Sequence, residues 1–245
     1  MPHFYVNPEN ISNDNFFIEG EQAHYVYSVR RFNTNDEIMI FDGLGNSYKG
    51  KILSAEKSKI AGKILSSSYK MPEFKINLYA AIPKGDRFEW LIEKAGELGV
   101  TAVIPINTKR SVNTSFSQNK LERYEKISVA ASSQCGRNDI MGINMPIDFK
   151  TACEKAATDK NFISILPWES EGSKASLESA AENFKSAAGA NIFIGPEGGF
   201  ENEEVDFAKS LGIKTITLGS NILRVETAAV VASVLILNLF GMYGK

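Results

Sequence analysis

The sequence is poor in cysteine and has no long hydrophobic run. Two cysteines, Cys135 and Cys153, are too few for a disulfide framework or a zinc site, so we expect two reduced thiols and no metal. The longest apolar stretch, Ala228–Phe240, is interrupted by polar residues and is shorter than the roughly 20 residues that span a bilayer. The N-terminus shows no basic-then-apolar signal segment. These absences indicate a soluble, cytoplasmic protein that does not bind a membrane.

The chain also has little net charge, since 27 basic and 29 acidic residues leave −2 at neutral pH. This balance gives no overall basic surface of the kind that nucleic-acid-binding proteins show. Residues 43–70 differ, because lysines stand there against Glu56 alone. The lysines of this segment are Lys49, Lys51, Lys57, Lys59, Lys63 and Lys70. A nucleic-acid-binding face and a solvated lysine-rich strand surface explain this pattern equally well.

The first seventy residues favour β-structure. Short runs typical of strands occupy Phe4–Val6, Glu37–Asp42, Ser47–Ala55 and Lys59–Ser66. Between the early strands, residues 21–31 are expected to form a helix with Ala23, Val26, Tyr27 and Arg30 on one face. A polar run at residues 66–73 marks a boundary. We therefore predict a small β-barrel domain over residues 1–72 and a second domain over residues 73–245.

From residue 74 the pattern changes to alternating strands and helices. Apolar runs typical of strands occupy Ile76–Ile82, Ala102–Ile106, Phe162–Leu166, Ile192–Ile194 and Thr215–Leu218. The clearest helix is Arg87–Leu98, where apolar residues recur at helical spacing. This alternation predicts an α/β domain with a largely parallel sheet. Because ligands bind such sheets beyond the carboxyl ends of the strands, functional residues are expected in segments 83–87, 167–172, 195–200 and 219–226.

The segment GPEGGF, residues 195–200, follows a predicted strand and precedes a helix. Its glycines allow backbone to approach a ligand closely, although a glycine cluster on its own is more often a tight turn. It lacks the Gly-Lys-Ser/Thr ending of a phosphate-binding P-loop and does not fit Gly-x-Gly-x-x-Gly. Glu201, Glu203 and Glu204 at the start of the next helix suit the helix dipole but repel phosphate. A ligand without phosphate is therefore expected.

A second segment, LGSNILRVETAA at residues 218–229, leads from a strand into the apolar helix. Arg224 and Glu226 are charges beside a buried element, where charges need partners. Two interpretations stand: a structural ion pair with Thr227 as helix N-cap, or functional side chains with the loop backbone as a ligand surface. The helix Ala228–Phe240 is apolar on nearly all sides, so the fold or a second subunit must enclose it.

These two C-terminal segments together closely resemble the RsmE family, the 16S ribosomal-RNA uridine-N3 methyltransferases of the SPOUT superfamily. Further family-like segments extend the match over nearly the whole chain: Met1–Val6, His24–Arg31, KGDR at 84–87, IEKAGELGV at 92–100 and Gln134–Arg137. The chain departs from the family pattern at Asn221, where arginine is usual, and at Ser133, where a glutamate often precedes the glutamine. The resemblance implies an α/β fold: a SPOUT (trefoil-knotted) methyltransferase domain with an N-terminal PUA-like, RNA-binding β-barrel.

The resemblance also implies S-adenosylmethionine as cofactor, 16S ribosomal RNA in the small ribosomal subunit as substrate, and a homodimer. The cofactor carries no phosphate, in agreement with the acidic start of the helix after GPEGGF. Two rival functions are a non-catalytic RNA-binding protein and an α/β enzyme for a small nucleotide. The presence of both C-terminal loop motifs disfavours the first, and the missing phosphate loop disfavours the second.

Site residues follow from the chemistry and the resemblance together. Because N3 of uridine carries a proton, the site must align donor and acceptor and favour the uracil anion. Catalytic candidates are Arg137 and Arg224, for the anion or an RNA phosphate, and Glu197 and Glu226, for orientation or deprotonation. Predicted cofactor-binding residues are Leu166, Gly195, Pro196, Glu197, Gly198, Gly199, Leu218, Gly219, Ile222, Leu223 and Arg224. Predicted RNA-binding residues are His24, Arg30, Arg31, Lys49 and Lys51.

Overall fold

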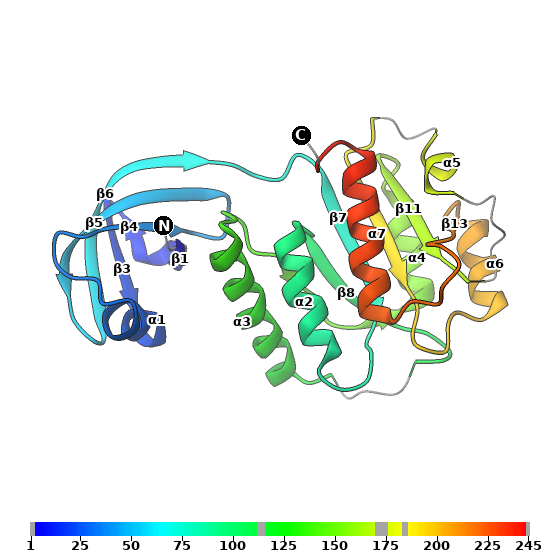
Figure 1. The fold of residues 1–245 in the computed structure, drawn as a ribbon, viewed down its shortest axis with the longest axis horizontal. Coiled ribbons are helices and arrows are strands. Elements are labelled where there is room, and N and C mark those ends of the chain that lie inside the picture. The colour runs from blue at the N-terminus through cyan, green and yellow to red at the C-terminus, as the bar shows by residue number, and fades with distance from the viewer. Residues whose placement is uncertain (1–2, 112–115, 170–175, 183–185, 244–245) are drawn as a thin grey trace. The chain divides into compact units, whose positions relative to one another are not determined.

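The computed structural model describes residues 3–111, 116–169, 176–182 and 186–243, which form two compact units (Figure 1). The first unit holds Met1–Met71 and Val129–Ile140, and the second holds Pro72–Ser128 and Met141–Lys245. The first division between the units thus falls between residues 71 and 72. The later segment, residues 129–140, also belongs to the first unit, and the single boundary predicted from the sequence does not include this return of the chain. The start of the family-like segment, residues 1–2, and residues 170–172 of a predicted site segment lie outside the described residues.

The N-terminal unit is built on one mixed β-sheet. Its strands are β1 (His3–Tyr5), β2 (Ile11–Ser12), β3 (Asn15–Glu19), β4 (Glu37–Phe41), β5 (Asn46–Ala55) and β6 (Lys59–Tyr69). They lie in the order β1-β4-β5-β6-β3-β2, and only the β1–β4 pairing is parallel among the pairings of these described strands. Alternate residues of the strands point to one buried face, where Phe16 is fully buried. A Cβ atom at Gly62 would lie 2.2 Å from the Phe16 ring, so the core requires glycine there.

The helix predicted over residues 21–31 is confirmed only in part. It divides into α1 (Gly20–His24), which is α-helical, and η2 (Tyr25–Val29), which is a π-helix. The π-type hydrogen bond runs from Arg30 N to Tyr25 O and is 3.0 Å long. Because a π-turn holds one more residue than an α-turn, it changes which side chains share a face.

The burial of the side chains in residues 21–31 agrees with this change of face. Ala23 and Val26 are buried, as the predicted helix requires. Tyr27 and Arg30, which were predicted on the same face, are exposed, so that part of the prediction is wrong.

The C-terminal unit is built on a parallel β-sheet. Its strands are β7 (Lys75–Ala81), β8 (Ala102–Asn107), β9 (Gly142–Ile143), β10 (Ile147–Asp148), β11 (Phe162–Pro167), β12 (Gly189–Ile194) and β13 (Lys214–Ile216). They lie in the order β10-β8-β7-β12-β11-β13, with β9 paired to β8. Every pairing among these described strands is parallel, which confirms the predicted sheet type. The last strand ends at Ile216, two residues before the predicted end, because Thr217 and Leu218 belong to a loop.

Helices cover both faces of this sheet. They are α2 (Arg87–Leu98), α3 (Gln118–Cys135), α4 (Phe149–Thr158), α5 (Leu177–Ala181), α6 (Asn202–Ser210) and α7 (Val225–Leu239), and α3 runs on into the residues assigned to the first unit. Residues that alternate along β7 face two different cores. Leu78 packs with α2 and α7, whereas Tyr79 packs with α4 and α6 (Figure 1). The sheet is therefore buried on both faces, as is typical of parallel sheets.

The C-terminal apolar helix begins earlier than the sequence predicts. Its N-cap position is Arg224, so Thr227 lies inside the first turn and the prediction of Thr227 as N-cap is wrong. The inner face of α7, which includes Ala229, Ala232 and Ile236, is buried against α2 and the sheet. Among the described residues no helix is long and apolar enough to cross a membrane.

Candidate active site

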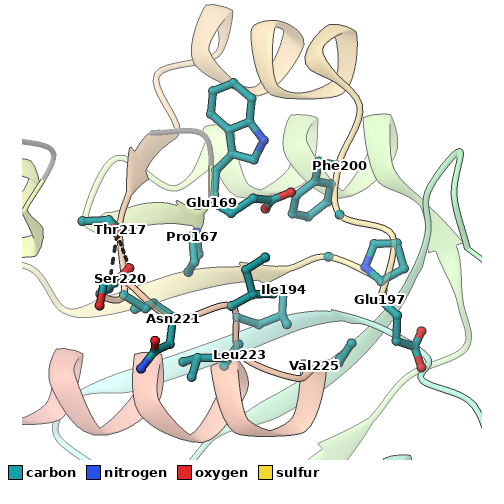
Figure 2. A pocket seen from close by; sticks show the side chains of 18 residues that line it. Pro167, Glu169, Ile194, Glu197, Phe200, Thr217, Ser220, Asn221, Leu223 and Val225 are labelled. Carbon is teal, nitrogen blue, oxygen red and sulfur yellow. Dashed lines mark hydrogen bonds between the residues drawn. The ribbon is translucent and has the colours of Figure 1, made fainter. Parts of the chain in front are cut away.

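A pocket opens where three parallel strands of the C-terminal unit end. Its volume is about 400 Å³, a size typical of small-molecule sites. The lining comes from the segments that follow β11, β12 and β13, and from the first turns of α7 (Figure 2). The lining residues are Pro167, Trp168, Glu169, Ile194, Gly195, Pro196, Glu197, Gly199, Phe200, Thr217, Leu218, Gly219, Ser220, Asn221, Ile222, Leu223, Val225 and Ala228. The pocket therefore lies at the sheet edge where the sequence predicts a ligand.

The glycine-rich loop forms one wall of the pocket through a tight turn. Gly199 N donates to Pro196 O at 2.9 Å, which closes the turn. Gly199 has φ of +69°, in the left-handed region that favours glycine. A Cβ atom there would lie 2.6 Å from Glu169 Oε1, the end of an exposed side chain that can move aside. The backbone conformation therefore favours glycine at this position.

The loop between β13 and α7 forms the other wall. Thr217 Oγ1 accepts from Gly219 N (3.2 Å) and donates to Gly219 O (3.1 Å), which folds the loop back on itself (Figure 2). Ile222 is 86% exposed although it is apolar. Asn221, which departs from the family pattern, also lines the pocket. The loop thus presents apolar side chains and backbone groups to the pocket.

The charges that line the pocket are all negative. Glu169 and Glu197 contribute carboxylates, and the lining residues of the described chain include no lysine or arginine. Figure 2 shows Glu197 at the edge of the pocket, on the side of Val225. Such a lining repels phosphate and favours a ligand that carries positive charge.

Most residues predicted to bind the cofactor line this pocket, but three do not. Leu166 is fully buried in the core beside the pocket. Gly198 turns its carbonyl oxygen to Arg110 Nη1, at 2.8 Å. Arg224 is exposed at the start of α7. That any of these residues binds a cofactor stays a prediction. Among the lining residues that were not named as cofactor-binding, Glu169 lies inside the predicted segment 167–172, and Thr217 directly precedes the predicted Leu218.

Two predicted catalytic residues meet at an arginine beside the pocket. Arg87 Nη1 lies 3.7 Å from Glu197 Oε1, and Arg87 Nε lies 4.0 Å from Glu226 Oε1. Glu197 Oε1 also accepts from Lys84 N at 3.1 Å. The ion-pair partner of Glu226 in the described chain is thus Arg87, not Arg224 as the structural interpretation of the sequence supposed. Arg87 ends the predicted site segment 83–87, but it was not named there as a site residue.

The glycine-rich loop is tied to the segment that follows β8. Lys109 N donates to Glu204 Oε1 (2.9 Å), and Lys109 Nζ pairs with Glu201 (3.1 Å) and with Glu203. Arg110 Nε lies 3.7 Å from Glu201 Oε1. The hydrogen bond from Lys109 lowers the pKa of Glu203, and the same bond raises the pKa of Lys109. These contacts hold the loop and the start of α6 in place.

The remaining predicted site residues belong to the N-terminal unit. Arg137 donates from Nε to Asp139 Oδ1 (3.2 Å), and both side chains are nearly buried. His24 directly precedes the π-helix, Arg30 and Arg31 follow it, and all three side chains are exposed. Lys49 pairs with Glu37 at 2.7 Å, and Lys51 stands directly opposite Lys63 on the neighbouring strand. Their roles in RNA binding stay predictions.

Comparisons with known proteins agree along the whole chain. The family described as RNA methyltransferase domain matches residues 70–237, and the family described as RNA methyltransferase PUA domain matches residues 18–65. The chain is 34% identical to ribosomal RNA small subunit methyltransferase E of Mesomycoplasma hyopneumoniae, with 94% of this chain and 96% of that protein covered. It is 30% identical to the protein of the same name from Bacillus subtilis, with 89% and 87% covered.

Solved structures give the same result. A ribosomal RNA small subunit methyltransferase E from Neisseria gonorrhoeae, bound to S-adenosylmethionine, is similar with a TM-score of 0.86 and 28% identity over the full length of both chains. A probable rRNA methyltransferase from Porphyromonas gingivalis is similar with the same TM-score, 26% identity and full coverage of both chains. The predicted α/β architecture, with an N-terminal PUA-like unit and an RNA methyltransferase domain, is confirmed.

Proposed function

Because the chain belongs to the ribosomal RNA small subunit methyltransferase E family, we propose that it methylates N3 of a uridine in 16S ribosomal RNA with S-adenosylmethionine. The family's known target is uridine 1498, and we propose the same target here. The observation that carries the proposal is the pocket at the ends of β11, β12 and β13, which lies within the matched methyltransferase domain. The homologous structure from Neisseria gonorrhoeae binds this cofactor.

The residues of the pocket fit S-adenosylmethionine. The cofactor carries positive charge on its sulfonium and ammonium groups and has no phosphate, so the carboxylates of Glu169 and Glu197 suit it. The backbone of Gly195–Gly199 and of Leu218–Leu223 offers donors and acceptors for the adenosine and the carboxylate. Ile194 supplies apolar contact surface. We therefore assign the predicted cofactor-binding residues that line the pocket to this ligand.

The proposed reaction needs a proton acceptor near the substrate base. When bound, S-adenosylmethionine supplies an electrophilic methyl group on a positively charged sulfur. Uridine N3 is a poor nucleophile until its proton leaves, and the carboxylates of Glu226 and Glu197 are the proposed groups that orient N3–H or accept the proton. Arg224, exposed at the start of α7, is the proposed ligand of an RNA phosphate or of the uracil anion. Arg137, in the N-terminal unit, is proposed to contact RNA.

We also propose that the protein is a homodimer and works in the cytoplasm. The dimer is supported by exposed apolar side chains on the outer face of α7, among them Leu235. The cytoplasm follows from the proposed substrate, since bacterial ribosomes are found there. RNA affinity is assigned to the PUA-like unit through its exposed arginines, Arg30 and Arg31.

Nucleoside analysis tests the function directly. Purified protein is incubated with S-adenosylmethionine and either free 16S RNA or small ribosomal subunits that lack the modification. The RNA is then digested and separated by liquid chromatography with mass detection. We expect 3-methyluridine in at least one arm, in a fragment that contains uridine 1498. Methylation at another position of the uracil ring, or none in either arm, would contradict the proposal.

A further inference from the structure

Arg87 occupies a place beside the pocket that the cofactor assignment does not explain. It is the first residue of α2, and its guanidinium lies between two carboxylates, 3.7 Å from Glu197 and 4.0 Å from Glu226. Glu197 comes from the glycine-rich loop and Glu226 from the first turn of α7. One arginine thus links three separate elements that meet at this edge of the pocket.

The carboxylate of Glu226 is buried but incompletely paired. Its side chain is only 12% exposed, and its Oε2 atom has no hydrogen-bond partner among the described residues. Its neighbours Val225 and Ala228 in the first turn of α7 line the pocket, whereas Glu226 itself does not. Buried carboxylate oxygens normally have donors, so Oε2 has unused capacity to accept a hydrogen bond.

Glu197, in contrast, is already held by the protein. Lys84 N donates to its Oε1 at 3.1 Å, and Arg87 faces the same oxygen. Arg87 therefore lies within 4.0 Å of one carboxylate that the backbone fixes and of one whose second oxygen has no partner among the described residues. A planar guanidinium that faces two carboxylates fixes their relative orientation better than a single ammonium.

We propose that Arg87 is a positioning residue for the methyl transfer. It holds Glu226 against Glu197 so that Glu226 Oε2 accepts the N3 proton of the bound uridine. In that step the N3–H bond breaks, the proton passes to the carboxylate, and the N3 electron pair forms the new bond to the methyl carbon. The carbon–sulfur bond of the donor breaks at the same time and leaves S-adenosylhomocysteine. This inference rests on the proposed function, and it adds a role for a residue that need not touch either substrate.

Kinetics of three variants test this role. In Arg87→Gln the guanidinium is lost, and we expect kcat for 16S RNA methylation to fall about 100-fold because the acceptor is misplaced. The affinity for S-adenosylmethionine, measured by calorimetry, is expected to stay close to the wild-type value, since Arg87 does not line the pocket and Lys84 N still donates to Glu197. Arg87→Lys keeps the charge and is expected to recover part of kcat. In the double variant with Glu226→Gln, the losses should not add, because the two residues act as a unit.

Arg123 offers a matched control. Arg123 of α3 pairs at the surface with Glu89 of α2, the helix that also carries Arg87, at 2.7 Å. Arg123→Gln therefore removes an arginine–glutamate pair that involves the same helix but no residue of the pocket lining. We expect its kcat to match the wild type. A wild-type kcat in Arg87→Gln would overturn the inference, as would losses that simply add in the double variant, or a loss confined to cofactor affinity. Absence of 3-methyluridine with the wild-type protein would instead refute the proposed function, so the two failures are distinguishable.

Discussion

Glu204 joins two segments of the chain through its two carboxylate oxygens. Oε1 accepts from Lys109 N (2.9 Å), and Oε2 accepts from Glu201 N (3.0 Å), at the start of α6. The residue is buried. A glutamate at the third position of a helix that reaches back to the N-cap backbone is half of a capping box. Glu204 therefore fixes both the helix start and its link to the segment after β8.

Replacing Glu204 with alanine leaves both backbone donors without this partner. Both bonds are partly buried, so water can replace part of what each contributes, and we expect the free energy of unfolding to fall by roughly 1–3 kcal/mol. Urea denaturation followed by circular dichroism measures this change. Glu203→Ala is the control, because Glu203 is exposed and pairs only at the surface; it should stay close to the wild type. Equal stability of the two variants would contradict this role of Glu204.

The two cysteines differ in burial, and this difference predicts their reactivity. Burial raises the pKa of the Cys153 thiol to about 12, and the negative charges of Glu204 and Glu154 add to the effect. A raised pKa keeps the thiol protonated, so the reactive thiolate of Cys153 is scarce in the folded protein well above pH 9. Cys135 is exposed. With iodoacetamide at pH 9 we expect labelling of Cys135 alone, and of both cysteines in urea; peptide mass analysis that finds native Cys153 labelled would refute this.

At the scale of elements, periodicity predicts structure well where the helix is regular. Arg87–Leu98 was predicted from apolar spacing alone and has these same bounds, since Phe88, Leu91, Ile92 and Ala95 are buried in the core. Residues 21–31 show the opposite case. The π-turn inserts one residue into the helical repeat, and no residue type marks that insertion in a single sequence.

A strand was also missed in the N-terminal unit. β3 (Asn15–Glu19) alternates between exposed and buried residues, with Phe16 and Ile18 inside. It follows Asn13 and Asp14, which both have positive φ, as the residues of a tight hairpin turn do. The Asn-Asp pair before alternating residues was a usable signal. The strand was missed because it is only five residues long and has polar residues at both ends.

The candidate site was predictable where loops follow strands. The pocket lies at three of these loops because parallel strands place their carboxyl ends together. The link between Arg87, Glu197 and Glu226 was not predictable, since Arg87 stands more than a hundred positions before either glutamate along the chain. Arg87 follows β7 and Glu197 follows β12, so they meet because these two strands are neighbours in the sheet. The periodicity of a sequence does not predict which strands are neighbours.

The glycine-rich loop makes a prediction about cofactor affinity. Valine at Gly199 must adopt a left-handed φ, which β-branched residues disfavour, and its Cβ meets Glu169. We expect Gly199→Val to weaken S-adenosylmethionine binding at least about tenfold, equivalent to about 1.4 kcal/mol, while circular dichroism still shows a folded protein. Gly198→Ala is the matched control, because its Cβ meets only Arg110 side-chain atoms, at 3.4 Å or more. Calorimetry that finds wild-type affinity in Gly199→Val removes the loop from the site.

For the whole molecule, nucleic-acid affinity must come from a local surface, because the chain carries a net charge of only −2. Arg30 and Arg31 are exposed in the PUA-like unit, and Arg31 has a left-handed φ of +57° that is uncommon for arginine. In contrast, Lys49 already pairs with Glu37. The arginines are therefore the stronger candidates for RNA phosphates.

Replacing Arg30 and Arg31 with glutamine tests this surface. Each phosphate contact contributes about 0.7–0.9 to the slope of log affinity against log salt, so we expect the slope to flatten by roughly 1.5. Affinity for S-adenosylmethionine should not change, since the pocket is built from the other unit. Lys126→Gln with Lys155→Gln removes the same charge from the methyltransferase unit and serves as the control. An unchanged slope in the arginine variant would show that RNA is read elsewhere.

The outer face of α7 bears on assembly. Leu235 is 39% exposed and Leu239 is 37% exposed. Val231, one turn before Leu235, and Val234, directly before it, are half-buried. These residues recur at helical spacing on a face next to the one that carries the buried Ala232 and Ile236. The protein's own core therefore encloses only one face of this apolar helix. An apolar stripe left open to water favours association with a second copy.

Sedimentation equilibrium at low micromolar concentration decides whether that second copy binds. We expect the unmodified protein to show twice the chain mass of 27.0 kDa. Leu235→Glu places a charge on the open face without entering the core, so it should yield a folded monomer. A charge at buried Leu237 would disturb the core as well and could not separate folding from association. Leu53→Glu, at an exposed leucine of the N-terminal unit, controls for added charge and should leave the dimer intact. A monomer mass for the unmodified protein, with full methyltransferase activity at the same concentration, contradicts the dimer.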